Sequence, residues 1–425
     1  MLGEKRLWLF VVLVLVAGFL LDFHGVTGQQ TKQTRLFIDK ADVHMSYRAV
    51  PARYPFFDSD LRYAYRYNNQ WYVTTLDSYS QTGLYTSIDL SNKNYPAISY
   101  RGPNVKGDTF SLSGGNLRLL KSIRFVGAGG NCVNAQWICE IIDTPNGGYT
   151  SIQFDKNKIR HIGYGASGIN HAEFVSSGGN CGYDTNGNLV GTWKCENVDP
   201  SGDMLEITTD ANSKVHIAYY RYPFGGGPDG LHYTTFVGAG GNCGNGRWQC
   251  ERVESDGNRG YEPSIDIDDS GIPHISYHDA YDNYDLKYTT FVGAGGNCGY
   301  DTNGNLVGTW QCTTIDTAGK AGQYSSIKID SSGIPHIAYT VRETGEVRYT
   351  TLTNGGAGNC GNGRWQCEIV DTRALGEVIL DFDKNGIQHI GYRNADVMHA
   401  EFVSSGGNCG NGRWQCETVD HDSDL

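Results

Sequence analysis

The stretch Ser264-Ile-Asp-Ile-Asp-Asp-Ser-Gly-Ile-Pro-His-Ile-Ser-Tyr277 decides the fold prediction. Its apolar and polar residues alternate on both sides of an Asp-Asp-Ser-Gly turn, a pattern that predicts two antiparallel strands. A third alternating run, 286–291, leads through a Gly- and Asn-rich loop to Cys298, and a fourth run contains Thr309-Trp-Gln-Cys312. The stretch therefore predicts a unit of four short strands.

The same unit recurs along the chain and can be followed by a Trp in its fourth strand. The spacing between successive Trp is 49 to 66 residues, and a four-stranded unit of this length is typical of propeller blades. We therefore predict an all-β, seven-bladed β-propeller of four-stranded antiparallel blades. The Trp residues are Trp71, Trp137, Trp193, Trp248, Trp310, Trp365 and Trp414. The predicted blades are approximately 35–78, 79–145, 146–200, 201–255, 256–317, 318–372 and 373–425, after a short linker at 29–34.

The first two repeats diverge from the others. The first has no Cys and a shorter first turn, and the second carries Ser91 and Ala97 where other repeats carry Asp and His. Each still has an aromatic fourth strand, so both are interpreted as blades. Because neither terminal repeat has a spare strand, we expect the ring to close by face-to-face packing.

The twelve cysteines follow the repeat in six pairs. In an extracellular chain, such pairs predict one disulfide within the hairpin between the third and fourth strands of blades two to seven. Zinc is the alternative, but no His or further Cys lies near each pair. The pairs are Cys132 with Cys139, Cys181 with Cys195, Cys243 with Cys250, Cys298 with Cys312, Cys360 with Cys367, and Cys409 with Cys416.

The N-terminus has the features of a secretory signal peptide, predicted at residues 1–28. Residues 7–21 are all apolar or Gly, follow charged residues, and precede small residues near position 28. A helix of this apolar run reaches about 22 Å, short of the roughly 30 Å hydrocarbon core of a bilayer. A permanent anchor and a retained assembly helix stay as alternatives. We expect a secreted, extracellular or cell-surface protein that contacts a membrane only if this segment is retained.

The net charge of −12 disfavours nucleic acid as a partner. It leaves glycans, cations and other proteins, including a second copy of the chain.

In five repeats an Asp in the first turn precedes a His by six residues. Such pairs could bind metal or transfer protons, but their recurrence favours a structural role, with Asp in the turn and His in a ring of buried hydrogen-bonding groups. The pairs are Asp155 and His161, Asp210 and His216, Asp268 and His274, Asp330 and His336, and Asp383 and His389. The repeated Trp residues are likewise predicted to pack between blades, with stacking on sugars as the alternative.

Calcium is the only cofactor that the sequence suggests. Asp266, Asp268 and Asp269 are weak candidate ligands, and strand alternation would send the first two to one face. Residues 184–188, repeated at 301–305, resemble the start of a calcium loop but lack its Glu, and Asn-Gly favours an extended hairpin turn.

Irregular loops mark the face where binding is expected. In a four-stranded meander the connections between strands two and three emerge on the face opposite the Asp turns and Cys hairpins, and variable loops on a rigid scaffold commonly carry binding sites. The loop 278–285 has a His, three Asp and two Tyr, which suit sugar hydroxyls or a cation, although a solvated acidic loop is the favoured interpretation. The candidate ligand-binding residues are Arg221, Tyr222, Phe224, His278, Asp279, Tyr281, Asp282, Tyr284 and Asp285.

The turns Asp269-Ser-Gly271 and Ser331-Ser-Gly333 resemble those of the secreted propellers that include Asp-box, or bacterial neuraminidase repeat, proteins. The resemblance covers 35–425 and implies a propeller fold and a connection with glycans. An Asp-box normally ends in an aromatic residue and lies between strands three and four, whereas these turns lead into Pro-His-Ile between strands one and two. The Arg triad and the Tyr and Glu of a sialidase have no counterparts that we can place.

These observations favour a non-enzymatic, multivalent binding, adhesion or scaffold protein whose partner is a glycan or a protein at the cell surface. Self-assembly, with a second copy of the chain as the partner, is a further hypothesis. The alternative is a carbohydrate-active hydrolase or lyase with its site on the irregular-loop face. No catalytic residue is assigned.

Overall fold

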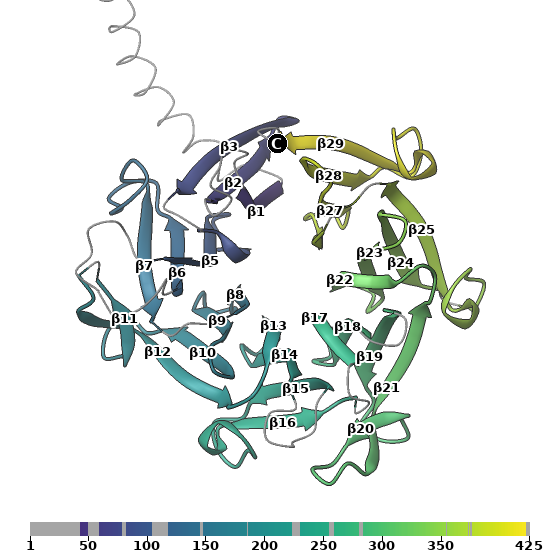
Figure 1. Ribbon diagram of the computed structural model, residues 1–425, viewed down its shortest axis with the longest axis horizontal. Coiled ribbons are helices and arrows are strands. Elements are labelled where there is room, and N and C mark those ends of the chain that lie inside the picture. Colours follow the sequence, from purple (N-terminus) through teal and green to yellow (C-terminus); the bar gives the residue numbers. More distant parts are fainter. Residues whose placement is uncertain are drawn as a thin grey trace, which may run out of the picture.

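The computed structural model describes residues 43–49, 59–78, 82–103, 118–144, 148–184, 186–222, 230–254, 259–279, 284–353, 355–372, 374 and 376–421. In these residues the chain is all-β apart from three short 3-10 turns, which confirms the all-β part of the predicted fold class. The strands form a ring of antiparallel groups (Figure 1). Among the described residues no helix has the length and apolar character needed to cross a membrane.

The strands are grouped here by their order along the chain. Group 1 contains β1 (Val43–Ala49), β2 (Asp60–Tyr67) and β3 (Gln70–Asp77). Group 2 contains β4 (Leu84–Leu90), β5 (Pro96–Pro103), β6 (Arg118–Phe125) and β7 (Trp137–Asp143). Group 3 contains β8 (Thr150–Phe154), β9 (Arg160–Gly165), β10 (Ile169–Phe174) and β12 (Leu189–Asp199). Group 4 contains β13 (Asp203–Thr209), β14 (Val215–Arg221), β15 (Gly230–Phe236) and β16 (Trp248–Arg252).

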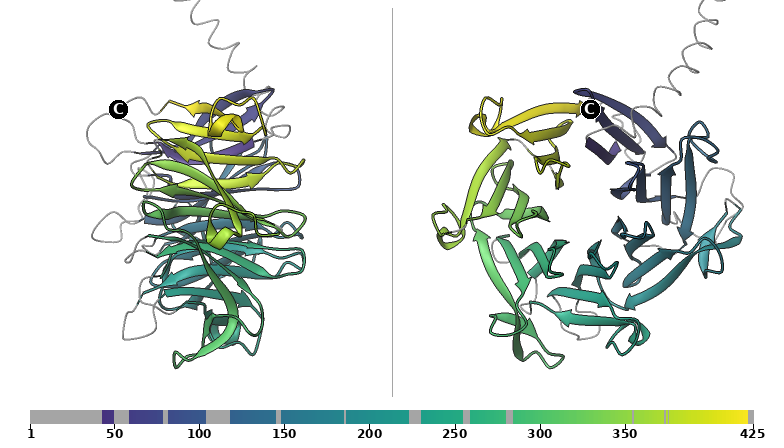
Figure 2. Two further views of the ribbon diagram at one scale, coloured as in Figure 1. Left: turned by 90° about the vertical axis from the view of Figure 1, so that its right-hand side faces the viewer. Right: turned by 180° about the vertical axis from the view of Figure 1, so that it is seen from behind.

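The remaining groups follow the same order. Group 5 contains β17 (Arg259–Ile267), β18 (Pro273–Asp279), β19 (Leu286–Phe291) and β21 (Leu306–Asp316). Group 6 contains β22 (Ala321–Ile329), β23 (Pro335–Val341), β24 (Glu346–Leu352) and β25 (Trp365–Thr372). Group 7 contains β26 (Val378–Phe382), β27 (Gln388–Arg393), β28 (Val397–Phe402) and β29 (Trp414–Asp420). Strands such as β13, β17 and β22 lie nearest the centre of the ring, and β16, β21 and β25 lie outermost (Figure 1). The side view shows the groups stacked next to one another around the ring (Figure 2).

Group 1 has three strands in the described residues rather than the predicted four. The predicted first strand of this repeat precedes Val43 and falls outside the described residues, as do the signal peptide and linker. These three assignments stay predictions.

Two short strands join neighbouring groups. β11 (Cys181–Tyr183) pairs with β12 and also with β7, while β20 (Cys298–Tyr300) pairs with β21 and also with β16. Groups 2 and 3 thereby form one nine-stranded sheet, and groups 4 and 5 form another. The extended hairpins that the sequence predicts therefore lean sideways onto the preceding group.

The disulfide pairing is confirmed, with all twelve cysteines in the six predicted hairpins and none free. The repeated Gly-Asn-Cys sequence has a local cause. At Gly241 an added Cβ would lie 2.0 Å from the carbonyl oxygen of Trp248, so only Gly fits against that strand. The Asn242 side chain then donates to the carbonyl of Cys250 at 2.9 Å and accepts from its N–H at 2.7 Å.

Side chains on the innermost strands connect each strand to the next around the ring. The Ser87 hydroxyl accepts from the N–H of Ile152 at 3.1 Å, and Ser264 accepts from Ile327 at the same distance. An innermost strand is an edge strand, whose outward N–H groups need partners other than a strand of its own sheet. The repeated Ser-Ile dipeptide supplies those partners.

A tyrosine–carboxylate hydrogen bond joins successive groups at seven places in the described residues. In each, the hydroxyl of a tyrosine donates to an acidic residue at the end of the preceding group's outer strand. The bonds are Tyr100 to Asp77 at 2.9 Å, Tyr164 to Asp143 at 2.6 Å, Tyr219 to Asp199 at 2.8 Å, Tyr277 to Glu254, Tyr339 to Asp316 at 2.7 Å, Tyr392 to Asp371 at 2.6 Å, and Tyr47 to Asp420 at 2.7 Å.

The last of these bonds joins group 1 to group 7 and closes the ring. Arg62 adds an ion pair to Asp420 at 2.7 Å, and Ala64 packs against Val397 and Val419. The described residues contain no strand pairing between β3 and β29. Among the described residues, side-chain contacts therefore join the two ends of the ring, and closure by packing alone stays a prediction.

The repeated Trp residues lie between groups. Trp310 contacts Tyr233 of the preceding group with ring centroids 5.1 Å apart, and Trp71 contacts His399 across the closure at 5.3 Å. The six from Trp137 to Trp414 are at most 2% exposed. For these six residues the alternative of stacking on sugars is therefore wrong, because no ligand can reach their faces, whereas Trp71 is half-buried.

The repeated His residues are buried between the third strand and the first turn. His216 Nδ1 lies 2.6 Å from the Tyr233 hydroxyl, and its Nε2 lies 3.7 Å from Asp210. His274 repeats the arrangement at 2.6 Å from Tyr288 and 3.6 Å from Asp268. Burial lowers the pKa of His216 to about 4, so the neutral imidazole serves as a structural hydrogen-bonding group.

Candidate functional site

The structure separates the residues that the sequence grouped as a binding site. Phe224, Tyr281 and Asp282 lie outside the described residues. Arg221 lines a lateral pocket between groups 4 and 5, whereas Tyr222 contacts Tyr220 near the axis of the ring at a centroid distance of 5.0 Å.

The other four candidates lie beside the innermost strand of group 5. His278 is buried, stacks on Tyr284 with centroids 5.8 Å apart, and has its Nδ1 3.8 Å from a carboxylate oxygen of Glu262. Asp279, also buried, accepts from the N–H of Asp285 at 3.2 Å. These side chains pack against the protein instead of projecting from a loop.

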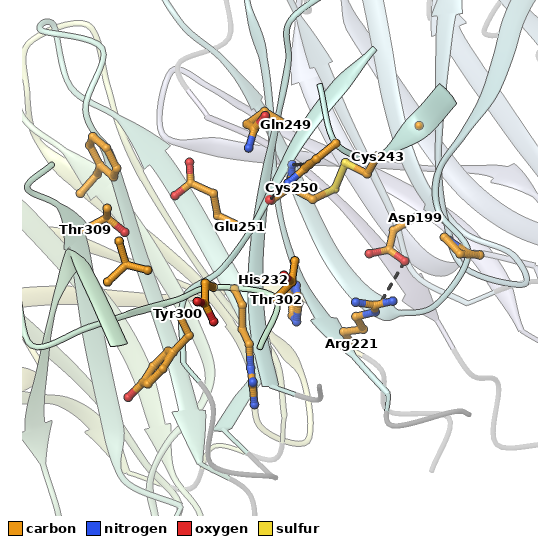
Figure 3. A pocket seen from close by; sticks show the side chains of 17 residues that line it. Asp199, Arg221, His232, Cys243, Gln249, Cys250, Glu251, Tyr300, Thr302 and Thr309 are labelled. Atoms are coloured by element: carbon orange, nitrogen blue, oxygen red, sulfur yellow. Dashed lines mark hydrogen bonds and ion pairs between the residues drawn. A yellow bond between two sulfur atoms is a disulfide. The ribbon is translucent and has the colours of Figure 1, made fainter. Parts of the chain in front are cut away.

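The lateral pocket has a volume of about 630 Å³. Figure 3 shows Asp199 and Arg221 on one side, Tyr300 on the other, and Glu251 and His232 between them. Its floor comes from β15 and β16, and one wall comes from the extended hairpin of β20 and β21. The Cys243–Cys250 disulfide also lines the pocket.

The two extended hairpins pack against different residues of the preceding group. Residues 181–193 and 298–310 have the same sequence, but Tyr183 lies opposite Ile141 whereas Tyr300 lies opposite Arg252. The Arg252 guanidinium lies 5.8 Å from the centre of the Tyr300 ring. An identical hairpin therefore covers an apolar residue in group 2 and a charged one in group 4.

The three carboxylates of this pocket are engaged by scaffold donors. Asp199 accepts from Tyr219 and lies 3.6 Å from Arg221 Nε, and Glu251 accepts from the Trp310 indole at 2.9 Å. Asp301 accepts from the N–H of Asn305 at 2.8 Å, and bonds from Asn305 hold the pKa of Asp301 below its usual value. Carboxylate oxygens held in fixed positions in this way are suited to accept hydrogen bonds from a ligand.

The sequence reading missed most of this pocket, because Glu251, Arg252, Tyr300 and Asp301 belong to repeated segments that it assigned to the scaffold. One signal was available. The residue after the Glu of the fourth strand is Arg in group 4 but Ile at positions 141 and 369, Asn at 197 and Thr at 418. A charged residue at a position that is uncharged in these other repeats indicates a candidate functional residue.

The weak calcium candidates bind backbone groups. Asp266 accepts from the N–H of Ile329 at 2.8 Å, and Asp268 accepts from Ser270 and Ile272 at 2.9 and 2.8 Å. Asp269 is exposed. In the described part of the chain no three His, Cys, Asp or Glu side chains gather as metal ligands. Calcium binding stays an untested prediction.

No family model matches this chain, and a search of curated proteins finds no match. Solved structures show distant similarity. A polysaccharide lyase of family PL25, an ulvan lyase bound to -[GlcA(1-4)Rha3S]-, is 13% identical with a TM-score of 0.42, covering 78% of this chain and 80% of that one. A lectin of Aleuria aurantia is 10% identical with a TM-score of 0.42, covering 80% and 96%. The intramolecular trans-sialidase of Ruminococcus gnavus is 12% identical with a TM-score of 0.36, covering 83% and 86%. Likenesses this distant say nothing about ligand or activity.

Proposed function

We propose that this chain is an extracellular, non-enzymatic binding protein built on a seven-bladed β-propeller, and that it binds a saccharide in the lateral pocket. The observation that carries this proposal is the composition of the pocket. Planar polar groups of Arg221, Gln249, Glu251 and Arg252 line the pocket together with the Tyr300 ring, and Arg252 lies beside that ring. Such groups form paired hydrogen bonds with vicinal hydroxyls, and an aromatic face packs on the apolar face of a sugar ring. The volume of about 630 Å³ is in the usual range for small-molecule sites.

We infer the number of blades from the hydrogen bonds that link successive strand groups. Seven tyrosine–carboxylate bonds join successive groups in one closed circuit, and each connects equivalent positions of the repeat. A ring of seven blades accounts for this circuit. Six disulfides support an oxidising, extracellular location, and the signal peptide proposed for residues 1–28 would direct the chain there.

The engaged carboxylates favour binding over catalysis. A hydrolase needs one carboxyl group that gives up a proton and another that acts as a base or nucleophile. In the pocket, Glu251 is held by Trp310, and Asp199 by Tyr219 and Arg221.

Multivalency and self-assembly remain separate predictions, which light scattering over a range of protein concentrations would test.

Replacing Arg252 by Ile should lower saccharide affinity by about 10-fold or more, because a hydrogen bond to a charged group contributes roughly 1.5–3 kcal/mol. Ile already stands at the equivalent position 141, so the fold should tolerate the change. A glycan array identifies the ligand, and calorimetry with that glycan measures the effect.

The duplicated hairpin supplies a matched control. Tyr300→Ala should weaken glycan binding, whereas Tyr183→Ala alters the same hairpin outside the pocket and should leave binding unchanged. Equal losses in the two variants, or an array without any bound glycan, would overturn the proposal. Hydrolysis or cleavage of the bound glycan that is lost in Glu251→Gln would instead support the enzyme alternative.

A further inference from the structure

The interface between groups 2 and 3 lacks two side-chain rings that the other groups supply. In six of the seven groups a Tyr or His ring on the third strand of the repeat contacts the Trp of the next group. Group 2 has Ser122 at that position, and it has Ala97 where the other groups have the repeated His. The six ring contacts, by centroid distance, are Tyr63 to Trp137 at 5.4 Å, His171 to Trp248 at 5.2 Å, Tyr233 to Trp310 at 5.1 Å, Tyr288 to Trp365 at 5.1 Å, Tyr349 to Trp414 at 5.3 Å, and His399 to Trp71 at 5.3 Å.

Charged side chains lie at this interface instead. Strand register places Ser122 beside Glu140, and Arg124 follows two residues later on the same face of β6, which packs against group 3. Arg160 of group 3 forms an ion pair with Glu140 at 2.6 Å and lies 4.7 Å from the centre of the Trp193 ring. A guanidinium group therefore contacts the Trp that a Tyr or His ring contacts at the other interfaces.

Three buried hydrogen-bond donors at this interface have no acceptor among the described residues. They are the hydroxyl of Ser122, the Nε of Arg124 and the indole Nε1 of Trp193. Ser122 and Trp193 are both fully buried. In group 5, by contrast, the equivalent indole of Trp310 donates to Glu251 at 2.9 Å. Buried polar groups are almost always paired with protein, water or an ion, so three such donors indicate a bound species that accepts hydrogen bonds.

The charged residues that face one another here are two arginines and one glutamate. Glu140 is already engaged by Arg160. Burial and the nearby Arg160 lower the pKa of Arg124, whereas Glu140 raises it. Both guanidinium groups thus act on a region that contains a single carboxylate. Among the described residues, this interface therefore carries one more positive charge than negative charge.

The other carboxylates near this end of the strands are engaged by backbone groups. Asp89 lies on the same face of group 2, two strands away from Arg124, and accepts from the N–H of Phe154 at 2.6 Å. Asp155 accepts from the N–H of Ile159 at 2.7 Å. Residues 104–117, which fall outside the described residues, connect β5 and β6 at the opposite end of these strands. The donors and charges named here therefore come from a continuously described part of the two groups.

We propose that a small monovalent anion of the chloride type binds between groups 2 and 3, held by the Ser122 hydroxyl, Arg124 and the Trp193 indole. Such an ion accepts charge-assisted hydrogen bonds from several N–H and O–H donors at once, and its charge balances the second arginine. Water would accept the hydrogen bonds without balancing the charge. A divalent anion would bring more negative charge than this interface can balance. The site is separate from the lateral saccharide pocket, which lies between groups 4 and 5.

Thermal unfolding of the full mature protein in sodium chloride and in sodium gluconate, at equal sodium concentration, tests the proposal. The melting temperature should be higher by about 2 °C or more in roughly 300 mM chloride, because a ligand that binds only the folded state raises it. Bromide should act like chloride.

Arg124→Thr should abolish the difference between chloride and gluconate. Thr stands at the equivalent positions 235, 290 and 351, so the fold should tolerate this change. Arg364→Ala removes an exposed arginine from group 6 and serves as the matched control, which should keep the full difference.

Equal melting temperatures of the unmodified protein in chloride and gluconate would overturn the proposal in favour of ordered water. A difference that Arg124→Thr retains would also overturn it, because chloride would then act at another place. If Arg124→Thr does not fold, anomalous diffraction from crystals of the unmodified protein in sodium bromide decides: a bromide ion in contact with Ser122 and Arg124 supports the site, and its absence overturns it. Each of these outcomes leaves the saccharide proposal intact, because the Arg252→Ile experiment tests a different pocket.

Discussion

Acidification from pH 7 to pH 4 is expected to unfold this protein, because its folded state holds several histidines in the neutral form. Burial lowers the pKa of His161 to about 3 and those of His216, His278 and His389 to about 4. An unfolded chain protonates these residues near pH 6.5. A shift of one pKa unit corresponds to about 1.4 kcal/mol, so each histidine costs about 3 kcal/mol of stability by pH 4.

The direction of the change in stability follows from the number of protons that each state binds. Below pH 6.5 the unfolded state binds more protons at these sites than the folded state does, so stability is present above pH 6.5 and is lost as the pH falls toward 4. Carboxyl groups around the axis act in the opposite direction, since burial raises the pKa of Glu262 to about 7 and that of Asp89 to about 6. The histidine effect should prevail, because burial lowers the pKa of six described histidines and raises that of five described carboxyl groups, and the shift at His161 is larger than that at Glu262 or Asp89.

Urea unfolding followed by tryptophan fluorescence between pH 8 and pH 4 measures this dependence. Stability should be nearly constant above pH 7 and should fall by several kcal/mol between pH 6.5 and pH 4.5. A flat profile over that interval would contradict the expectation that the buried neutral histidines dominate the pH dependence of stability.

Asp316→Ala should lower the free energy of unfolding by about 3–5 kcal/mol, the usual cost of removing one partner from a buried charged network. Asp316 is buried and accepts from the hydroxyl of Tyr339 at 2.7 Å and from Arg348 at 2.7 Å. Without it, the buried Tyr339 hydroxyl loses its acceptor and group 5 loses its bond to group 6.

Chemical denaturation monitored by circular dichroism measures the loss for Asp316→Ala. Asp316→Asn, which keeps an acceptor oxygen, should lose less than Asp316→Ala, and Glu343→Ala serves as control because Glu343 is half exposed and pairs with an exposed Lys320. An effect no larger than that of Glu343→Ala would mean that the tyrosine–carboxylate bonds do not stabilise the ring.

The repeat made the strands and disulfides predictable. Alternation in the stretch 264–277 matches β17 and β18, and the Asp268 turn connects them. Cysteine pairing was equally local, since each disulfide joins residues 7 or 14 positions apart. Strand alternation, turn geometry and short loops depend on residues that are close together in the chain, so they can be predicted from the sequence alone.

The candidate sites could be predicted only in part. Arg221 was found because its loop is irregular, but Glu251, Arg252 and Tyr300 lie in repeated segments and meet only when the hairpin of group 5 leans onto β16. Similarly, the ion pair between Glu140 and Arg160 forms only where groups 2 and 3 pack together.

By itself, the sequence determined the strand-forming pattern, the repeat length and the cysteine pairs, because these arise from interactions within one unit. The tertiary structure alone decided which side chains meet between units, as in the Tyr47–Asp420 bond and the lateral pocket. The physical reason is that repeated units carry almost the same residues, so their local pattern is the same everywhere. The proposed saccharide pocket forms where a small difference between repeats, Arg252 opposite Tyr300, is brought together by packing across the ring.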